Sequence, residues 1–426
     1  MTRADGKVAA TVVVVGQGYV GLPVAMRAVD VGFSVVGFDV SESKVDGLRA
    51  GRTHIDDVTD ADVAAALSTG RYLPTSSRHD MNGFDIAVIT VPTPLREGAP
   101  DLSYIEDACR LLAGAMTFEC TVILESTTYP GTTEEIVAPL LESLSGLVAG
   151  RDFHLGFSPE RIDPGNPTWD FRRTPKVVSG VDPASLKVIQ AFYEQLVDTT
   201  VSVASPREAE FTKLLENTFR HVNIALVNEL AIHAQLLGID IWEVIRAAST
   251  KPFGFMPFHP GPGVGGHCLP IDPSYLSWKI QQDSGVGSRF IEIANDVNRQ
   301  MPAYVVHRVM LGLNERGKPT KSARILVLGV AYKKNSNDAR ETPATGVIRE
   351  LAKLGATLRV HDPHVQAFEL RDLVELVPLS VEEVQAADAV VLLTDHDDVD
   401  YSVVTANADY IFDTRHRLSG ENVESL

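Results

Sequence analysis

The stretch TVVVVGQGYVGL, residues 11–22, decides the fold of the first part of this 426-residue chain. Its β-branched start predicts a short buried strand over Thr11–Val15, and a glycine-rich turn follows directly. Gly16, Gly18 and Gly21 permit a tight turn, the close approach of a pyrophosphate, and packing of the next helix on the strand. The sequence therefore predicts a dinucleotide-binding unit, with a plain tight turn as the alternative interpretation.

Asp39 supports this interpretation, because it ends the next expected strand, Ser34–Phe38. An acidic residue at this place accepts hydrogen bonds from the two ribose hydroxyls of NAD and repels the 2′-phosphate of NADP. The amides at the start of the helix that follows Tyr19 and Val20 are expected to face the phosphates. We therefore predict NAD as the cofactor.

Short apolar runs alternate with helical patterns along most of the chain. The strands expected in the first half are Thr11–Val15, Ser34–Phe38, Ile86–Thr90, Thr121–Glu125, Phe153–Phe157 and Lys176–Ser179, with helices such as Leu22–Val31 and Ile105–Met116 between them. The last part repeats the pattern with strands Ala323–Leu328, Thr357–His361, Ala389–Leu393 and Tyr410–Phe412 and a helix over Glu341–Leu354. Such alternation is typical of a parallel sheet with helices on both faces.

One long helical pattern separates these two parts. Ser205 suits a helix N-cap and Pro206 the first helical position, and neither Gly nor Pro occurs over Arg207–Leu237. At about 1.5 Å per residue this helix is roughly 45 Å long, and it is expected to connect domains and pack against another subunit. It should end at Gly238, and a further helix should follow Met301-Pro302.

The predicted fold class is therefore α/β, with two doubly wound Rossmann-like domains joined by a long central helix. We expect an NAD-binding domain over residues 1–204, a helical dimerisation region with a cysteine loop over 205–313, and a second, smaller Rossmann-like domain over 314–426. The expected assembly is a homodimer through the central helix.

Composition excludes several classes of partner. The 38 basic and 56 acidic residues give a net charge of −18, which argues against a nucleic-acid or anionic-membrane surface. No stretch approaches the roughly 20 apolar residues of a membrane span. Cys109, Cys120 and Cys268 form no CxxC pair, which argues against a disulfide framework and a cysteine zinc site, and for a reducing, cytoplasmic compartment.

The segment GPGVGGHCLPID, residues 261–272, is the most informative candidate for catalysis. Glycines around Cys268 let a substrate approach the sulfur, so a nucleophile is favoured over a small buried hydrophobe. Asp272 is close enough in sequence to act in the same site. His267 is not expected to form a dyad with Cys268, because adjacent side chains usually point apart. Phe253, Phe255 and Phe258, of a type usually buried, favour a functional loop over a plain surface loop.

Polar residues also follow several expected strands. Ser126 and Thr127 either hold a water or phosphate or cap a helix. Glu160 is a possible general base, although taken alone such a residue is more often a solvated carboxylate. Lys213 and Asn217 share one face of the long helix, and this pair matters only if that face lines a cleft.

Charged residues cluster again after strands of the last domain. Lys333 and Arg340 are placed to bind a second diphosphate. Two groups resemble metal sites but show incomplete ligand sets, so a solvated loop is favoured and no metal is expected. These groups are His361, Asp362 and His364, and Asp395, His396 and Asp397.

These motifs, in this order, resemble the UDP-glucose/GDP-mannose dehydrogenase family of nucleotide-sugar 6-dehydrogenases. The resemblance extends over essentially the whole chain. It rests on GQGYVGLP (16–23), VPTP (91–94), ESTTYPGTT (125–133), SPERIDPGN (158–166), Lys213 with Asn217, PGPGVGGHCLPIDP (260–273) and GVAYKKNSNDARETP (329–343).

The resemblance implies oxidation of a C6 alcohol to a carboxylate, with two NAD reduced. Cys268 would form a thiohemiacetal and then a thioester, and Lys213 would stabilise oxyanions. Asp272 with Thr127 would activate a water for the first oxidation, Glu160 would be the base for thioester hydrolysis, and Asn217 would position the substrate. The implied nucleotide-sugar contacts are Glu160, Lys213, Asn217, Phe258, Gly265, Lys333 and Arg340, and the implied NAD contacts add Thr93, Ser126 and Thr127 to the glycine turn and Asp39.

The exact substrate stays open between UDP-glucose and a UDP-N-acetylhexosamine, with dTDP-glucose as a further alternative. Two other classes compete with this interpretation. A regulator that binds a nucleotide sugar and NAD without turnover would need neither Cys268 nor Lys213 nor Asp272. A β-hydroxyacid-type dehydrogenase would oxidise once and need no thiol.

Overall fold

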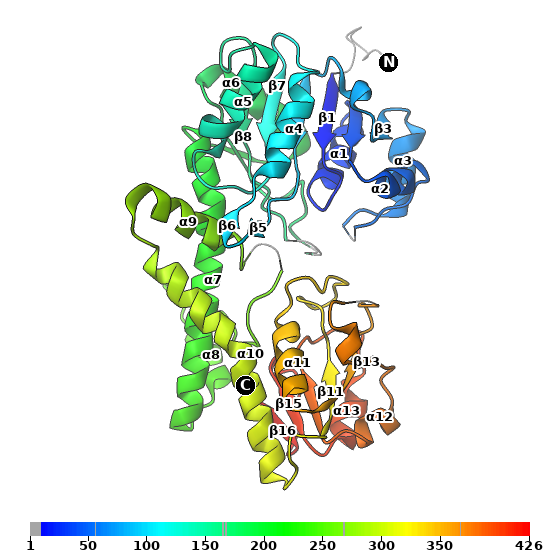
Figure 1. Cartoon of the computed structure of the whole chain (residues 1–426), viewed down its shortest axis with the longest axis vertical. Helices are drawn as coiled ribbons and strands as arrows, with labels where there is room; N and C mark the ends of the chain where they lie inside the picture. Colours follow the sequence, from blue (N-terminus) through cyan, green and yellow to red (C-terminus); the bar gives the residue numbers. More distant parts are fainter. Residues whose placement is uncertain (1–9, 56, 164–165, 167, 267–268, 367) are drawn as a thin grey trace. The chain divides into compact units, whose positions relative to one another are not determined.

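The computed structural model describes residues 10–55, 57–163, 166, 168–266, 269–366 and 368–426, so His267 and Cys268 lie outside the described residues. The chain divides into two compact units, with the division after Glu216. Each unit contains a six-stranded parallel sheet (Figure 1). The predicted α/β class with two Rossmann-like sheets is thereby confirmed.

The first sheet has the strand order β3-β2-β1-β4-β7-β8. Its strands are β1 (Thr11–Val15), β2 (Ser34–Phe38), β3 (Tyr72–Thr75), β4 (Ile86–Ile89), β7 (Thr121–Leu124) and β8 (His154–Phe157). Five of these six agree with the predicted strands to within a residue. The sixth, β3, was missed because it is a four-residue edge strand that contains Pro74, and a proline weakens any strand signal.

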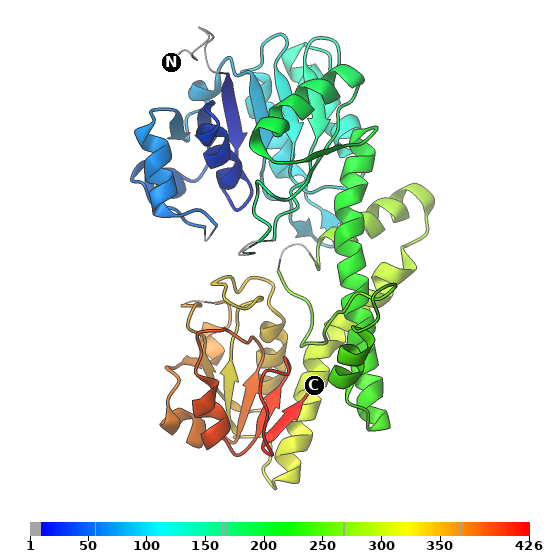
Figure 2. The same ribbon diagram turned by 180° about the vertical axis from the view of Figure 1, so that it is seen from behind.

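Helices cover both faces of this sheet. On one face lie α1 (Gly21–Asp30), α3 (Asp60–Ser68) and α6 (Pro183–Leu196), and on the other lie α4 (Ser103–Ala113) and α5 (Ala138–Ser145) (Figures 1 and 2). The remaining elements of this unit are α2 (Glu42–Arg49), the short hairpin β5 (Leu95–Arg96) and β6 (Ala99–Pro100), the 3-10 helix η1 (Arg78–Met81), the π-helix η2 (Thr133–Val137), and the pair β9 (Lys176–Val178) and β10 (Thr200–Ser202). Valines of β1, fully buried, form the core with α1 and α6.

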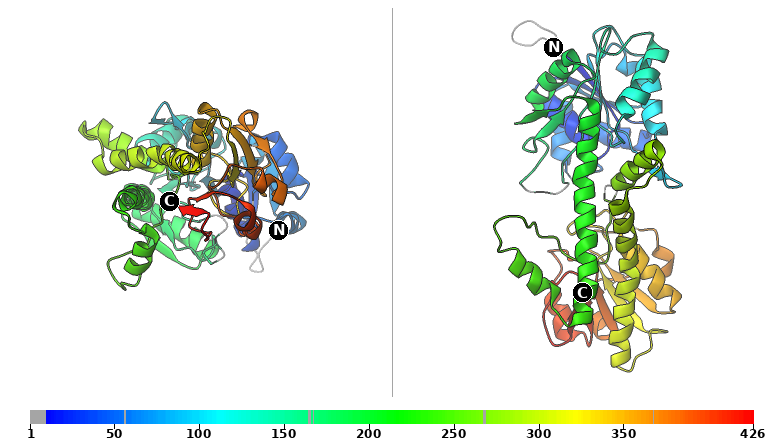
Figure 3. Two further views of the ribbon diagram at one scale, coloured as in Figure 1. Left: turned by 90° about the horizontal axis from the view of Figure 1, so that it is seen from below. Right: turned by 90° about the vertical axis from the view of Figure 1, so that its left-hand side faces the viewer.

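The long helix α7 covers Pro206–Leu237, as predicted (Figure 3). Gly238 ends it in the left-handed region, at φ 68°, where the Ile239 amide donates to the Ala234 carbonyl. The helices α8 (Ile241–Ala248) and α9 (Asp272–Ser284) follow. Among the described residues, no helix combines the length and apolar character that crossing a membrane requires. The three-part domain division stays a prediction.

The helix α10 runs over Arg289–Glu315, with Pro302 inside it. The prediction that this helix begins after Met301-Pro302 was therefore wrong. A proline inside a helix costs about 3 kcal/mol. Met301, Val305 and Val309 are all fully buried in the core of the second unit, and burial contributes about 1.5–3 kcal/mol for each such side chain, which offsets the cost.

The second sheet repeats the spatial order of the first, as β13-β12-β11-β14-β15-β16. Its strands are β11 (Arg324–Leu328), β12 (Thr357–His361), β13 (Glu375–Leu376), β14 (Ala389–Leu392), β15 (Ile411–Asp413) and β16 (Val423–Ser425). Its helices are α10 and α11 (Pro343–Lys353) on one face and α12 (Val381–Gln385) and α13 (Tyr401–Asn407) on the other, with the 3-10 helix η3 (Arg371–Leu373) beside the edge strand β13.

A glycine follows the central strand of each sheet, at the point where the strand order reverses. Gly16 follows β1 at φ 95°, and a Cβ there would lie 2.6 Å from the Thr90 carbonyl oxygen. Gly329 follows β11 at φ 79°, and its Cβ would overlap the Thr394 carbonyl in the same way. Ligands of doubly wound sheets bind at this reversal point. Both units therefore offer a binding edge in the expected place.

Candidate active site

The glycine turn of the first unit has the shape that a diphosphate needs. A Cβ at Gly21 would overlap the Gly16 carbonyl, so Gly21 lets α1 pack closely on the turn. A Cβ at Gly18 would meet no protein atom within 4 Å, so this side of the turn is open. The first helical bond is donated by the Leu22 amide to the Gly18 carbonyl. The helix N-terminus and the open glycine together suit an anionic group.

Asp39 lies buried beside this turn, as predicted. Its Oδ2 accepts from the Gln17 amide at 3.0 Å and its Oδ1 from the Ser41 amide at 2.9 Å. Lys44 Nζ is 3.5 Å from the carboxylate. These contacts fix the carboxylate at the end of β2, where it can accept from ribose hydroxyls.

Ser126 and Thr127 follow β7 at the same edge of the sheet. The Ser126 hydroxyl donates to the Val91 carbonyl at 2.8 Å, which ties the end of β7 to the segment after β4. This bond uses the one proton of the hydroxyl, so Ser126 can serve a ligand only as an acceptor through its side chain. Thr93 and Thr127 are partly buried near this edge.

Glu210 was missed by the sequence reasoning, although it is fully buried on α7. Its carboxylate accepts from the Gly131 amide at 2.6 Å, from the Thr133 amide at 2.9 Å and from the Thr133 hydroxyl at 2.7 Å. Burial raises the pKa of Glu210 to about 7. The contact holds the segment after Thr127 against the helix that carries Lys213, so Glu210 positions two predicted site residues.

Glu160 lies in a buried cluster, so the interpretation of it as a solvated carboxylate was wrong. Its Oε1 accepts from the Arg161 amide at 2.6 Å and the Ile162 amide at 2.8 Å. Its Oε2 lies 2.7 Å from Lys176 Nζ, and the same ammonium also pairs with Glu125. Glu160 follows the end of β8 by three residues, and its contact with Lys176 places it at the start of β9. No motif signalled Lys176, because its partners are distant in sequence.

In the second unit, Asn217 is buried and its side-chain amide donates to Asp272 Oδ2 at 2.5 Å. Asp272 is the first residue of α9, where the helix N-terminus favours a carboxylate. Two predicted catalytic residues, 55 positions apart, are thus in direct contact. Lys213 is partly exposed and lies one turn before Asn217 on α7.

A buried amide network holds the start of the cysteine loop. The Gly261 amide donates to Asn228 Oδ1 at 2.9 Å, and Asn228 Nδ2 donates to Asn298 Oδ1 at 3.0 Å. These bonds join the loop to α7 and α10. Phe258 packs edge-on against Phe219 of α7, with ring centroids 5.7 Å apart.

Two other aromatic residues of this loop are exposed. Phe253 is 71% exposed and Phe255 is 43% exposed, so the expectation that they are of a buried type was wrong. Only a contact with a distant element decides whether a loop aromatic is buried, and sequence does not show such contacts.

The glycines before Cys268 pass close to the segment that carries Lys333 and Arg340. A Cβ at Gly265 would lie 2.8 Å from the Glu341 carbonyl oxygen, and one at Gly266 would lie 2.9 Å from the Tyr332 ring. The guanidinium of Arg340 is held by both oxygens of Asp338, at 2.7 and 2.8 Å. The predicted substrate residues Gly265, Lys333 and Arg340 therefore belong to one region.

Asp362 directly follows β12 in the second unit, just as Asp39 directly follows β2 in the first unit. It accepts from the backbone amides of Val330, Ala331, His364 and Val365 and from His396 Nε2 at 3.1 Å. Burial opposes ionisation, but the bonds from His396 and the amides outweigh it and lower the pKa of Asp362. The Asp362 and His396 side chains are fully buried, so the solvated-loop interpretation was wrong for both.

Among the described residues, His364, His396 and Asp398 are grouped closely enough to hold a metal ion. Both ring nitrogens of His396 already have partners, however. Nδ1 accepts from the Asn335 amide at 2.9 Å, which leaves the proton on Nε2 for Asp362. These side chains therefore form a hydrogen-bond network in which neither nitrogen of His396 is available to a metal ion.

The other two cysteines are poor nucleophiles. Cys109 and Cys120 are free and buried. Burial raises the pKa of the Cys109 thiol to about 12, and it raises that of Cys120 as well. Because the thiolate is the reactive form, neither residue competes with Cys268 as a candidate.

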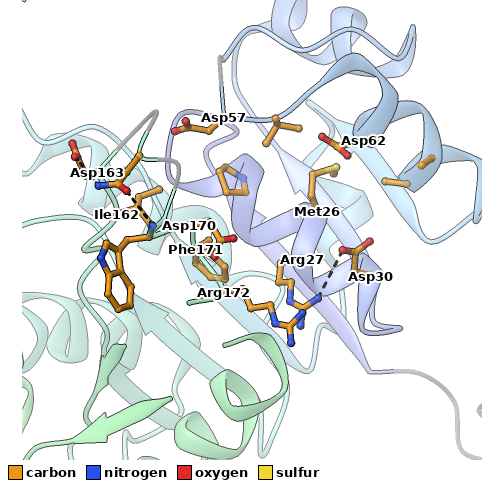
Figure 4. Close-up of a pocket in the computed structure, with 16 residues that line it drawn as sticks. Met26, Arg27, Asp30, Asp57, Asp62, Ile162, Asp163, Asp170, Phe171 and Arg172 are labelled. Carbon is orange, nitrogen blue, oxygen red and sulfur yellow. Dashed lines mark hydrogen bonds and ion pairs between the residues drawn. The ribbon is translucent and has the colours of Figure 1, made fainter. Parts of the chain in front are cut away.

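A cavity of about 380 Å³ opens beside α1 in the first unit (Figure 4). Its lining does not include the glycine turn or Asp39. The guanidinium groups of Arg27 and Arg172 are committed to the Leu196 carbonyl and to Asp198. They are outnumbered by the lining carboxylates, which are Asp30, Asp57, Asp62, Asp163 and Asp170. This balance disfavours a diphosphate, so the cavity is distinct from the cofactor edge.

Comparison with known proteins decides the family. Residues 10–197 match the NAD binding domain of the UDP-glucose/GDP-mannose dehydrogenase family, residues 207–300 its central domain, and residues 326–420 its UDP binding domain. The chain belongs to this family. The three matches follow the family order along the chain, and the family is one of oxidoreductases.

Two relatives in the family cover most of this chain. The UDP-N-acetyl-D-mannosamine dehydrogenase of Pyrococcus horikoshii is 37% identical over 90% of this chain and 89% of its own. The UDP-N-acetyl-D-glucosamine 6-dehydrogenase of Pseudomonas aeruginosa is 37% identical over 90% of each chain. A solved structure of the UDP-D-ManNAc dehydrogenase from P. horikoshii has a TM-score of 0.89 at 33% identity, over 97% of this chain and 98% of that one.

Asp39→Asn should weaken the binding of NADH by roughly 10- to 100-fold and that of NADPH less, because a hydrogen bond to a charged group contributes about 1.5–3 kcal/mol. Fluorescence titration of both nucleotides measures this difference. Asp46→Asn, at an exposed carboxylate of α2, is the matched control. An equal loss for both nucleotides would contradict the role of Asp39.

Asp362→Asn should lower the free energy of unfolding by about 3 kcal/mol at pH 7. The pKa of Asp362 in the folded state lies below its ordinary value of 3.8. The stabilisation is therefore present above about pH 4 and is lost as the pH falls through the folded-state value. Urea unfolding from pH 7 down to pH 2 tests this, with exposed Asp372→Asn as the control. A difference independent of pH would refute it.

Proposed function

We propose that the chain is an NAD-dependent nucleotide-sugar 6-dehydrogenase that oxidises the C6 alcohol of a UDP-N-acetylhexosamine to the uronic acid. The open Gly18 turn beside the Asp39 carboxylate, in a chain with all three family domains, carries the proposal. The relatives at 37% identity act on UDP-N-acetylated sugars, which favours that class over UDP-glucose and dTDP-glucose.

The first oxidation needs a base for the C6 hydroxyl proton. In our proposal Asp272 takes this proton through a water that Thr127 helps to hold, and Asn217 orients Asp272 through the bond at 2.5 Å. A bound NAD would supply the hydride acceptor for each of the two oxidations. The ammonium of Lys213 stabilises negative charge on the C6 oxygen electrostatically.

The second oxidation needs a covalent enzyme–substrate intermediate. The Cys268 thiolate adds to the aldehyde carbon and forms a thiohemiacetal, and loss of a second hydride leaves a thioester. Glu160 then takes a proton from a water, the water oxygen bonds to the thioester carbon, and the Cys268 sulfur leaves as a thiolate. The buried state of Cys109 and Cys120 supports the assignment of this step to Cys268.

The remaining candidate residues bind the cofactor or the substrate. We assign the diphosphate and ribose of NAD to Gly16, Gly18, Tyr19, Val20, Gly21 and Asp39, with Thr93, Ser126 and Thr127 near the nicotinamide side. Lys333 and Arg340 bind the diphosphate of the substrate, and Phe258 and Gly265 complete its site. Arg340 must then share its guanidinium between Asp338 and the ligand. We place the reaction in the cytoplasm, because free cysteines suit a reducing compartment.

We also propose a homodimer through α7. Five large apolar side chains along this helix, each 43–56% exposed, are spaced so that they fall on one face. They are Phe211, Leu215, Phe219, Leu226 and Leu230. A contiguous apolar stripe of this kind marks an interaction surface.

Wild-type protein should form two NADH per UDP-N-acetylhexosamine, and Cys268→Ser should form no uronic acid. The measurement follows NADH and product over a panel of UDP-GlcNAc, UDP-ManNAc, UDP-GalNAc, UDP-glucose, dTDP-glucose and GDP-mannose. Cys109→Ala, which removes a buried thiol, is the control. Full acid formation by Cys268→Ser would refute the covalent route. One NADH per substrate would favour a single oxidation, and none with any sugar would favour a non-catalytic regulator.

The double variant Leu215→Glu/Leu226→Glu should sediment as a monomer, because two buried charges in each copy cost more than the apolar contact contributes. Gln235→Glu adds a charge on another side of α7 and should leave the dimer intact. Analytical ultracentrifugation at micromolar concentration measures both. A monomeric wild type under the same conditions would contradict the proposed interface.

A further inference from the structure

Lys176 lies in the interior of the first unit between two carboxylates. Its ammonium pairs with Glu125 on one side and with Glu160 Oε2, at 2.7 Å, on the other. The three residues come from the ends of β7 and β8 and the start of β9. The lysine side chain is 2% exposed, that of Glu125 is fully buried, and that of Glu160 is 9% exposed. Glu160 is thus the member nearest to solvent and Glu125 the deepest.

Lys176 is the cation that acts on both carboxylates of this cluster. Tyr193 of α6 donates its hydroxyl to Glu125 Oε2 at 3.0 Å, and its ring and that of Phe171 lie 5.4 and 5.2 Å from the lysine nitrogen. The guanidinium of Arg161 turns away to Glu216 and the Pro175 carbonyl. Lys176 therefore has to balance two carboxylates.

One buried cation and two buried carboxylates leave an excess negative charge unless a proton is bound. Burial, with the nearby Glu160, raises the pKa of Glu125 to about 7 in spite of Lys176. Burial acts in the same sense on Glu160, but Lys176 and the Ile162 amide outweigh it and lower the pKa of Glu160. The proton is thus held by Glu125, and Glu160 stays charged.

The contacts that orient Glu160 also determine its strength as a base. Two backbone amides and one ammonium orient the Glu160 carboxylate, but they also stabilise its anion and make it a weak base. Ionisation of Glu125 adds a second negative charge to the same cluster. That charge raises the proton affinity of Glu160, because the two carboxyl groups are hydrogen-bonded to each other and also share the ammonium of Lys176.

We propose that Lys176 is a positioning residue for the acid-forming half of the reaction, and that Glu125 is a buried acid whose ionisation strengthens Glu160 as the base that takes a proton from the attacking water. This inference rests on the proposed function. Neither Lys176 nor Glu125 touches the substrate or the cofactor in this account, and both act through Glu160.

The conservative variant Glu125→Gln tests the coupling. Glutamine cannot ionise, and its one oxygen can accept from Lys176 while its amide donates to the Tyr193 hydroxyl oxygen. In wild-type protein kcat should rise as the pH increases through about 7, with two NADH formed per substrate throughout. In Glu125→Gln this inflection should be absent, while kcat at pH 6 stays within a few-fold of wild type. A Glu125→Gln profile that superimposes on the wild-type profile would overturn the coupling.

Lys176→Met tests the positioning role. It should reduce kcat by about 10²-fold, the lower range of what a positioned base contributes. The hydride transfers should survive, so a burst of two NADH per subunit precedes slow turnover, and intact-mass spectrometry detects the covalent thioester. Lys187→Met, at an exposed lysine of α6, is the matched control and should behave as wild type. Loss of the burst together with turnover would show a merely structural role and overturn the proposal.

The outcomes separate the inference from the proposed function. If Lys176→Met fails to fold, the Glu125→Gln profile alone decides. Wild-type protein that forms two NADH per substrate, together with an unchanged Glu125→Gln profile, overturns only the inference. Wild-type protein that forms no NADH with any nucleotide sugar overturns the proposed function and the inference with it.

Discussion

In each unit, the turn after the central strand passes very close to the end of the neighbouring strand. Both binding edges depend on this close approach. At Gly16 and Gly329 the space that a Cβ would need holds the carbonyl of Thr90 or Thr394. Only glycine fits there, and its positive φ turns the chain so that the following amides meet the acid at the end of the adjacent strand. The turn, its bond to the strand-end acid and the binding edge of each sheet all depend on this close approach.

The two units use the same strand-end acid differently. In the first unit Asp39 receives two backbone amides and has a lysine at 3.5 Å, so its carboxylate remains suited to a ribose. In the second unit Asp362 receives four amides and a histidine, so its acceptor capacity is used within the protein. The family match agrees with this contrast, because it places the NAD binding domain in the first part and the UDP binding domain in the last.

Local signals explain what could be predicted. The glycine turn, Asp39, the strands and the uninterrupted helix α7 are encoded in short stretches, through β-branched runs, glycines and a Ser-Pro start. Asn217 and Asp272 were singled out from a helix face and from the cysteine loop, and their catalytic roles came from the resemblance. Their contact agrees with a shared site. The sequence did not reveal Lys176 and Glu210, because a buried charge has no local signature when its partners lie from 16 to 79 residues away.

The sequence by itself determined the alternation of strands and helices, the cofactor edge and the family, since each depends on residue type at fixed spacing. Only the tertiary structure decided which polar residues are buried. Glu160, Asp362 and His396 looked like solvated residues, and Pro302 looked like a helix start. Burial of a charge is possible only where distant segments supply its partners, and burial of apolar residues offsets a helix-interior proline only where a core receives them.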